Sequence, residues 1–165
     1  MNSGSSYSGS TIFLDADLDF TGKTFEPIGT NFTRYFIGTF DGHGHVISNL
    51  KIKSTGPFVG LFGFSEGLII RNTVIDSTCS IEIPSSSKSS IRIAGFAGRC
   101  YGNIGQCIAE SSVNMASISY AGSVVNSDLC IGGISSEFIS SSKFTSIIRN
   151  CVNYGAIIQT GKSTN

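Results

Sequence analysis

The chain has 165 residues, enough for one domain with a substantial core. Eleven Lys and Arg residues balance eleven Asp and Glu residues, and charged residues make up only 13% of the chain. This balance gives no electrostatic support to nucleic acid or an anionic membrane as a partner, and we expect neither nucleic-acid binding nor membrane insertion. No apolar run is long enough to span a bilayer, and the first residues lack the regions of a signal peptide.

In chain order, we predict a flexible N-terminal tail at residues 1–10, followed by a single all-β domain at residues 11–158. The segment 11–20 alternates apolar and acidic residues, which predicts an opening strand with one buried face. Asp15, Asp17 and Asp19 share one face of that strand. Oxygen ligands of this kind suit calcium, but solvation and turn capping explain them better, so we predict no metal site.

A block then recurs along the chain, each time with a glycine followed by Asn or Gln. The spacings from the glycine to the amide are 11, 12, 11 and 17 residues. The distance from one amide to the next glycine is 11 residues in the first case, which gives a basic coil of 22 to 23 residues, and later coils carry insertions. A fixed internal period is typical of a solenoid, and coils this short predict a parallel β-solenoid of about four to five coils.

The repeated positions receive structural roles. We expect the amides to stack as a ladder at a bend, because each can donate and accept hydrogen bonds; they are Asn49, Asn72, Gln106 and Asn150. The glycines mark bends that need positive φ or close backbone approach; they are Gly38, Gly60, Gly95 and Gly133. An apolar column is expected beside the amides, formed by Ile47, Ile70, Ile104 and Ile148.

Polar tracts locate the insertions. Ser-rich segments at residues 84–90 and 140–143 predict loops that leave the domain surface. Residues 159–165 read as a C-terminal tail or as a truncated next coil. The chain is either a fragment or a short relative of longer repeat proteins.

Five cysteines show no spacing typical of zinc or redox motifs. We interpret them as small apolar residues stacked in successive coils. The alternative is a disulfide such as Cys100 to Cys107. The sequence leaves their redox state open.

The segment 40–52, followed by Val-Gly-Leu-Phe-Gly at 59–63, resembles the GLUG-motif repeat proteins. An acidic strand at 14–20 and a Pro-Ile-Gly turn at 27–29 precede it in the order typical of that group. Later segments match only as degenerate repeats. The resemblance implies a right-handed parallel β-helix from secreted or surface-attached, often adhesin-like proteins, and it implies no activity.

Candidate reactive groups do not combine into a site. His43 and His45 lack further ligands, and a Gly-rich turn explains them better than a metal. The acidic residues occupy different repeat positions, and the sequence contains no nucleophile or phosphate-loop motif. Asn31 opens the only N-glycosylation sequon, which matters only in a secretory pathway. We therefore predict no catalytic residues, no metal and no cofactor.

The function that the sequence predicts is a non-catalytic repeat module of a cell-surface or secreted protein. It would act as a rigid spacer or as a binding surface for a host or neighbouring-cell protein or glycan. Open end strands would allow coil-to-coil self-association or further repeats of a longer chain. The alternative is a fragment of a carbohydrate-active β-helix enzyme, which a groove with carboxylates and exposed Tyr101, Tyr120 or Tyr154 would favour.

Overall fold

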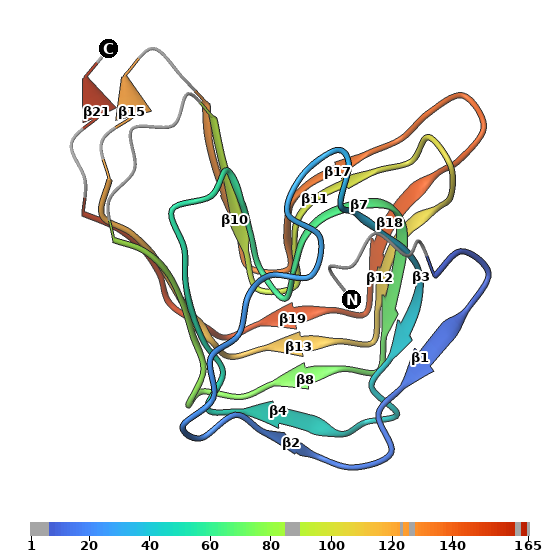
Figure 1. Cartoon of the computed structure of the whole chain (residues 1–165), viewed down its shortest axis with the longest axis horizontal. Coiled ribbons are helices and arrows are strands. Elements are labelled where there is room, and N and C mark those ends of the chain that lie inside the picture. Colours follow the sequence, from blue (N-terminus) through green and yellow to red (C-terminus); the bar gives the residue numbers. More distant parts are fainter. Residues whose placement is uncertain (1–6, 85–89, 123, 126–127, 161–162, 165) are drawn as a thin grey trace.

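The protein is all-β, and its strands pair in parallel. The computed structural model describes residues 7–84, 90–122, 124–125, 128–160 and 163–164. These residues form strands without a helix, and every pairing between named strands is parallel. The strands of each sheet come from distant parts of the chain, and the sheets surround a shared interior (Figure 1). This arrangement is consistent with a β-helix or β-solenoid.

The largest sheet carries most of the aromatic core. Its strands follow the order β1 (Thr11–Phe13), β3 (Phe36–Asp41), β7 (Phe62–Arg71), β11 (Ala97–Tyr101) and β17 (Ser135–Ile139), with β12 (Cys107–Glu110) and β18 (Ser146–Arg149) continuing from the second half of β7. The ten-residue β7 therefore pairs with two separate later strands.

Three further sheets, also parallel, close the interior. One contains β6 (Phe58–Val59), β10 (Ser90–Ala94) and β16 (Asp128–Gly132). Another contains β2 (Leu18–Asp19), β4 (Val46–Ser48), β8 (Val74–Ile75), β13 (Val113–Asn114) and β19 (Val152–Asn153). The third contains β5 (Lys51–Lys53), β9 (Ser80–Ile83), β14 (Ser117–Tyr120) and β20 (Ile157–Gln159). A short pair joins β15 (Val124–Val125) to β21 (Ser163–Thr164).

The structural repeat is longer than the sequence spacing predicts. Partners on neighbouring strands lie 30 residues apart between Asp41 and Arg71, and 39 residues apart between Glu110 and Arg149. The predicted basic coil of 22 to 23 residues is therefore wrong. The sequence analysis treated a glycine and an amide at different corners as one unit, because both corners carry similar residues.

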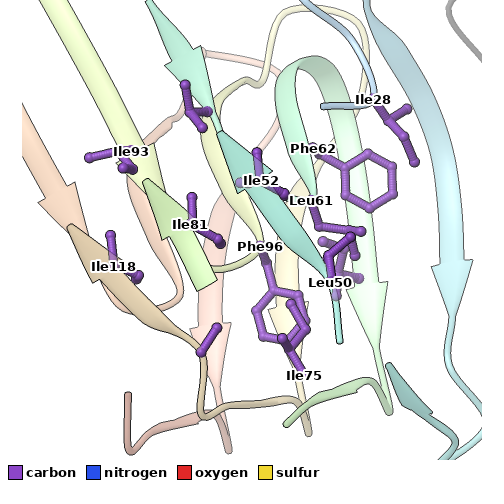
Figure 2. Packing of buried hydrophobic residues seen from close by; sticks show 14 of the residues in the cluster. Ile28, Leu50, Ile52, Leu61, Phe62, Ile75, Ile81, Ile93, Phe96 and Ile118 are labelled. Carbon is purple, nitrogen blue, oxygen red and sulfur yellow. The ribbon is translucent and has the colours of Figure 1, made fainter. Parts of the chain in front are cut away.

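The core consists of apolar columns that run from strand to strand. Ile52, Ile81 and Ile118 occupy one register on β5, β9 and β14, and each is at most 1% exposed. Figure 2 shows these three side chains one behind another. Burial of each such side chain contributes about 1.5–3 kcal/mol, so the columns supply much of the stability of the fold.

The predicted apolar column mixes positions that the structure separates. Ile70 and Ile148 lie in one register, with Ala109 between them. Ile47 pairs with Ile75 in another sheet, and Ile104 is 52% exposed in the loop after β11.

The opening segment is not one strand. Thr11–Phe13 pairs with β3 and Leu18–Asp19 pairs with β4, so the chain turns a corner within the acidic stretch. Tyr7, in the segment predicted as a flexible tail, stacks on Phe36 with ring centroids 5.7 Å apart. Residues 1–6 lie outside the described part.

The predicted insertions and C-terminal segment are only partly described. Residues 140–143 form a loop between β17 and β18, whereas 85–89 lie outside the described residues. Gln159 ends β20, and Ser163–Thr164 pairs with β15. This pairing joins the C-terminal segment to the sheets of the domain.

Candidate functional site

The most concentrated group of charged side chains joins two sheets on β10, β11 and β17. Glu137 lies between two guanidinium groups, with its carboxylate oxygens 3.1 Å from Arg92 Nε and 2.8 Å from Arg99 Nε. The Arg92 side chain is only 7% exposed, and Arg99 and Glu137 are largely buried. We call these three residues the Arg–Glu cluster.

Aromatic rings adjoin the Arg–Glu cluster. The guanidinium of Arg99 lies 4.5 Å from the centroid of the Tyr101 ring, and Arg99 Nη2 donates a hydrogen bond of 2.7 Å to the Tyr101 hydroxyl. Phe64 follows, with its centroid 6.1 Å from Tyr101, and Phe32 packs against Phe64 at 4.6 Å. Phe32 is 60% exposed, so this aromatic row reaches solvent at one end.

The Arg–Glu cluster braces two sheets and leaves little acid–base capacity. Burial alone would lower the pKa of Arg92, but the bond and charge of Glu137 outweigh it and the pKa is raised. Both carboxylate oxygens of Glu137 face a guanidinium. A carboxylate held in this way does not serve readily as a general acid or base.

A second set of charges forms an alternating column at the end of the largest sheet. Asp41, Arg71, Glu110 and Arg149 occupy one register on successive strands. Arg71 Nε donates to Asp41 at 2.7 Å, and Arg149 Nε donates to Glu110 at 2.7 Å. Opposite charges on adjacent strands stabilise the pairing of the sheet, which is a structural role.

Asp41 is the buried member of this column. Burial raises its pKa, but bonds from the His43 amide, the Asn72 side chain and Arg71 prevail, so the pKa of Asp41 is lowered. Asp41 thus remains ionised and orders the turn that follows β3.

The four predicted ladder amides do not form one column. Asn72 and Asn150 share a bend with Ser111, and all three adopt positive φ near 50°. Asn49 lies at a different bend, between β4 and β5, and its side chain donates to Asp19 at 2.9 Å. Gln106 lies in the loop between β11 and β12, where it lines a shallow, open hollow. The prediction of one amide ladder is therefore wrong.

An amide pair that sequence analysis missed lies inside the fold. Asn114 is fully buried, and its Nδ2 donates to Asn153 Oδ1 at 2.7 Å. Its own Oδ1 accepts from the Ala116 amide at 3.3 Å, so the buried side chain is satisfied. The repeated dipeptides Val113–Asn114 and Val152–Asn153 are the sequence signal that points to it.

Three of the predicted bend glycines occupy equivalent corners. Gly60, Gly95 and Gly133 each lie just before a strand of the largest sheet, and none has positive φ. A Cβ on Gly95 would come within 2.5 Å of Asn114 Cγ, so close packing against the amide pair requires glycine there. Gly38 lies inside β3 instead, with φ 146°.

The acidic segment and the histidines form local hydrogen bonds. Asp17 Oδ1 accepts from the Val46 amide at 2.9 Å and lies 3.1 Å from His45 Nδ1. The bond from Val46 and then that from His45 lower the pKa of Asp17. His43 packs on the Phe13 ring at 4.7 Å. Within the described residues, no three His, Cys, Asp or Glu side chains come together as metal ligands.

Two of the five cysteines are bonded. Cys100 and Cys107 form a disulfide, which closes the loop between β11 and β12. Our interpretation of all five as unpaired apolar residues is wrong for these two, and the alternative pairing is confirmed. Cys79, Cys130 and Cys151 are free, and burial raises the pKa of the Cys79 thiol.

The three tyrosines that would mark a carbohydrate groove lie apart. Tyr101 adjoins the Arg–Glu cluster, Tyr120 is fully buried, and Tyr154 is 72% exposed after β19. Tyr101 is therefore the only one of them beside a carboxylate of that cluster.

Comparisons with known proteins give no match among family models, curated proteins or solved structures. The resemblance to GLUG-motif proteins stays a prediction from the sequence motifs. In the part of the chain that the structure describes, we find no helix with the length and apolar character needed to cross a membrane.

Proposed function

We propose that the chain is a right-handed parallel β-helix of about four to five coils and a GLUG-type repeat module without catalytic activity. In this role it forms a rigid part of an adhesin-like protein at a cell surface or in a secreted protein. Its outer faces serve as a spacer or bind a protein or glycan of a host or neighbouring cell.

One observation carries this proposal: the charged side chains that come together neutralise one another across neighbouring strands. Glu137 pairs with Arg92 and Arg99, and Asp41 pairs with Arg71. Such pairs lock strand register and leave no free carboxylate beside a base for general acid–base chemistry. The Cys100–Cys107 disulfide supports a secreted or surface location, because disulfides persist in oxidising compartments.

A carbohydrate-active enzyme fragment is the second candidate. The observation that favours it is the contact of Arg99 with both Glu137 and Tyr101, since sugar-cleaving sites combine carboxylates, bases and aromatic rings. Under our proposal these groups brace the sheets and do not act on a substrate.

The two candidates are separated by assaying the purified chain on immobilised glycans and on soluble polysaccharides. We expect saturable binding to a glycan or protein surface and no release of reducing ends from any polysaccharide. Glu137→Gln is the test variant, and Glu82→Gln, which removes a more exposed carboxylate paired with Lys53, is the control. Depolymerisation by the wild type that is lost in Glu137→Gln and kept in Glu82→Gln would contradict the proposal.

A further inference from the structure

One end of the molecule exposes side chains that belong to its core. We call the edge formed by β18, β19 and β20 the terminal face. Its strands expose a set of large apolar side chains: Ile147 36%, Ile148 50%, Val152 40%, Ile157 48% and Ile158 45%. Among the described strands, none pairs with the outer side of β18, β19 or β20. A sheet edge with apolar side chains and open backbone groups is a surface for another strand.

The exposed residues continue columns that are buried elsewhere. Ile148 follows Ile70 in register and Ile157 follows Ile118, and both earlier residues are 0% exposed. The same chemistry therefore changes from buried to half exposed only because no strand covers the last layer. An occupant of the terminal face must supply β-strands that carry aliphatic side chains at these positions.

The opposite end is covered. Leu14 is 7% exposed, and Tyr7, Ile12, Phe20 and Phe25 pack against the core there. This covering removes the apolar surface that a head-to-tail stack would need. A second copy of the chain thus finds matching aliphatic strands on another terminal face and not on the opposite end.

The charges on the terminal face permit two such faces to meet. Asp128 pairs with Arg92, Glu137 pairs with both cluster arginines, and Arg149 pairs with Glu110. Each charged side chain on β16 to β20 thus has an opposite charge within its own chain. Two copies bring no unpaired like charges of these strands together, which removes the usual penalty against identical faces.

The order of the strands also favours self-association. Figure 1 shows β18 rising from one end of β19, and the chain continues from the other end of β19 to β20. Both flanking strands carry an Ile–Ile pair, Ile147–Ile148 and Ile157–Ile158. A two-fold axis across β19 would place β18 of one copy over β20 of the other, and a two-fold interface requires such self-matching.

We propose that two copies of this chain associate through their terminal faces, with β19 at the two-fold axis and the aliphatic pairs of β18 and β20 in contact. This association is independent of the proposed function. A monomeric chain would leave the binding-module proposal intact, and a polysaccharide-cleaving dimer would overturn only that proposal.

Sedimentation equilibrium of the whole chain over a range of concentrations tests the association. We expect the mass to reach twice 17.4 kDa, the mass of one chain. Ile148→Lys and Ile157→Lys should each raise the dissociation constant by more than about 100-fold, because each dimer would bury the new charge twice. Leu18→Lys, at the covered end and 37% exposed, is the matched control and should keep the wild-type constant.

Circular dichroism checks that each variant is folded, which we expect because the substituted side chains are already half exposed. Amide hydrogen exchange gives a second readout, in which β19 should gain protection with protein concentration and β2 should not. A wild-type chain that stays monomeric would refute the proposal. Growth beyond the dimer, or dissociation by Leu18→Lys, would indicate head-to-tail stacking and would also refute it.

Discussion

The earlier and later halves of the molecule, residues 36–83 and 90–160, use the same sheets in different ways. In the earlier half, partners lie 30 residues apart and β7 runs for ten residues without a break. In the later half, partners lie 39 residues apart and the strand corresponding to β7 is divided into β11 and β12. The hydrogen-bonded register on both sides of the division is preserved. Strand register therefore defines this fold, and the repeat length is free to vary where a loop leaves the surface.

The interiors of the two halves differ in the same direction. Ile47 and Ile75 fill one column in the earlier half, and Asn114 and Asn153 continue that column in the later half. The later half also has the disulfide that closes the inserted loop. We conclude that aliphatic burial holds the earlier half, whereas specific polar and covalent links hold the later half.

The largest effect is expected where aromatic packing is densest. Phe62 is fully buried, with its ring 4.9 Å from Phe36 and 5.6 Å from Phe40. Phe62→Ala should destabilise the protein by about 3–5 kcal/mol, measured by urea unfolding followed by circular dichroism. Phe138→Ala, at a half-buried phenylalanine of the later half, is the comparison and should cost clearly less. Equal losses would show that the two halves do not differ in aliphatic and aromatic burial.

A smaller effect is expected from the buried amide pair. Asn114→Ala removes the donor to Asn153 and leaves the Ala116 amide without its acceptor, and should cost about 1–3 kcal/mol. Hydrogen exchange should show the loss in β13 and β19, with β3 and β7 unaffected. Asn153→Ala should cost less, because Asn114 keeps its bonds to Ala116 and the terminal side is open to water. Uniform loss of protection across both halves would contradict this division.

Sequence patterns reached the architecture but not its register. Alternating strands, glycine-rich corners and repeated apolar blocks predicted an all-β chain of parallel strands, and the structure has one. They failed on the coil length and on the amide ladder because Asn49 and Asn72 both follow an aliphatic strand yet lie at different corners. Local sequence encodes the kind of bend, whereas the identity of the corner depends on long-range pairing that spacing alone does not reveal.

The candidate site was beyond reach for the same reason. Arg92, Arg99 and Glu137 lie on three strands, and only the pairing of β11 with β17 brings Arg99 beside Glu137. Neither residue stands in a recognisable motif. The Val–Asn dipeptides of the later half did carry a signal for the buried amides, but they repeat at 39 residues and fall outside the shorter period that the sequence analysis adopted.

The smallest expected effect concerns the two ends of the charged column. Because the pKa of Asp41 is lowered in the folded protein, Asp41 contributes stability that is fully present above the ordinary carboxyl value of about 4. That contribution is lost as the pH falls through the lowered pKa of the folded state. Arg71→Gln removes a bond and a charge that hold the pKa down, so the loss of stability on acidification should begin at higher pH than in the wild type.

Arg149→Gln is the matched control, because this more exposed arginine pairs with Glu110 and does not contact Asp41. It should cost no more than about 1 kcal/mol at neutral pH and leave the Asp41 transition in place. Asp17 and Asp19 also have lowered pKa values, so each variant is compared with the wild type at every pH to isolate the contribution of Asp41. If Arg149→Gln shifts the acid transition as far as Arg71→Gln, the column acts as one coupled unit, and the buried pair of the earlier half has no special role.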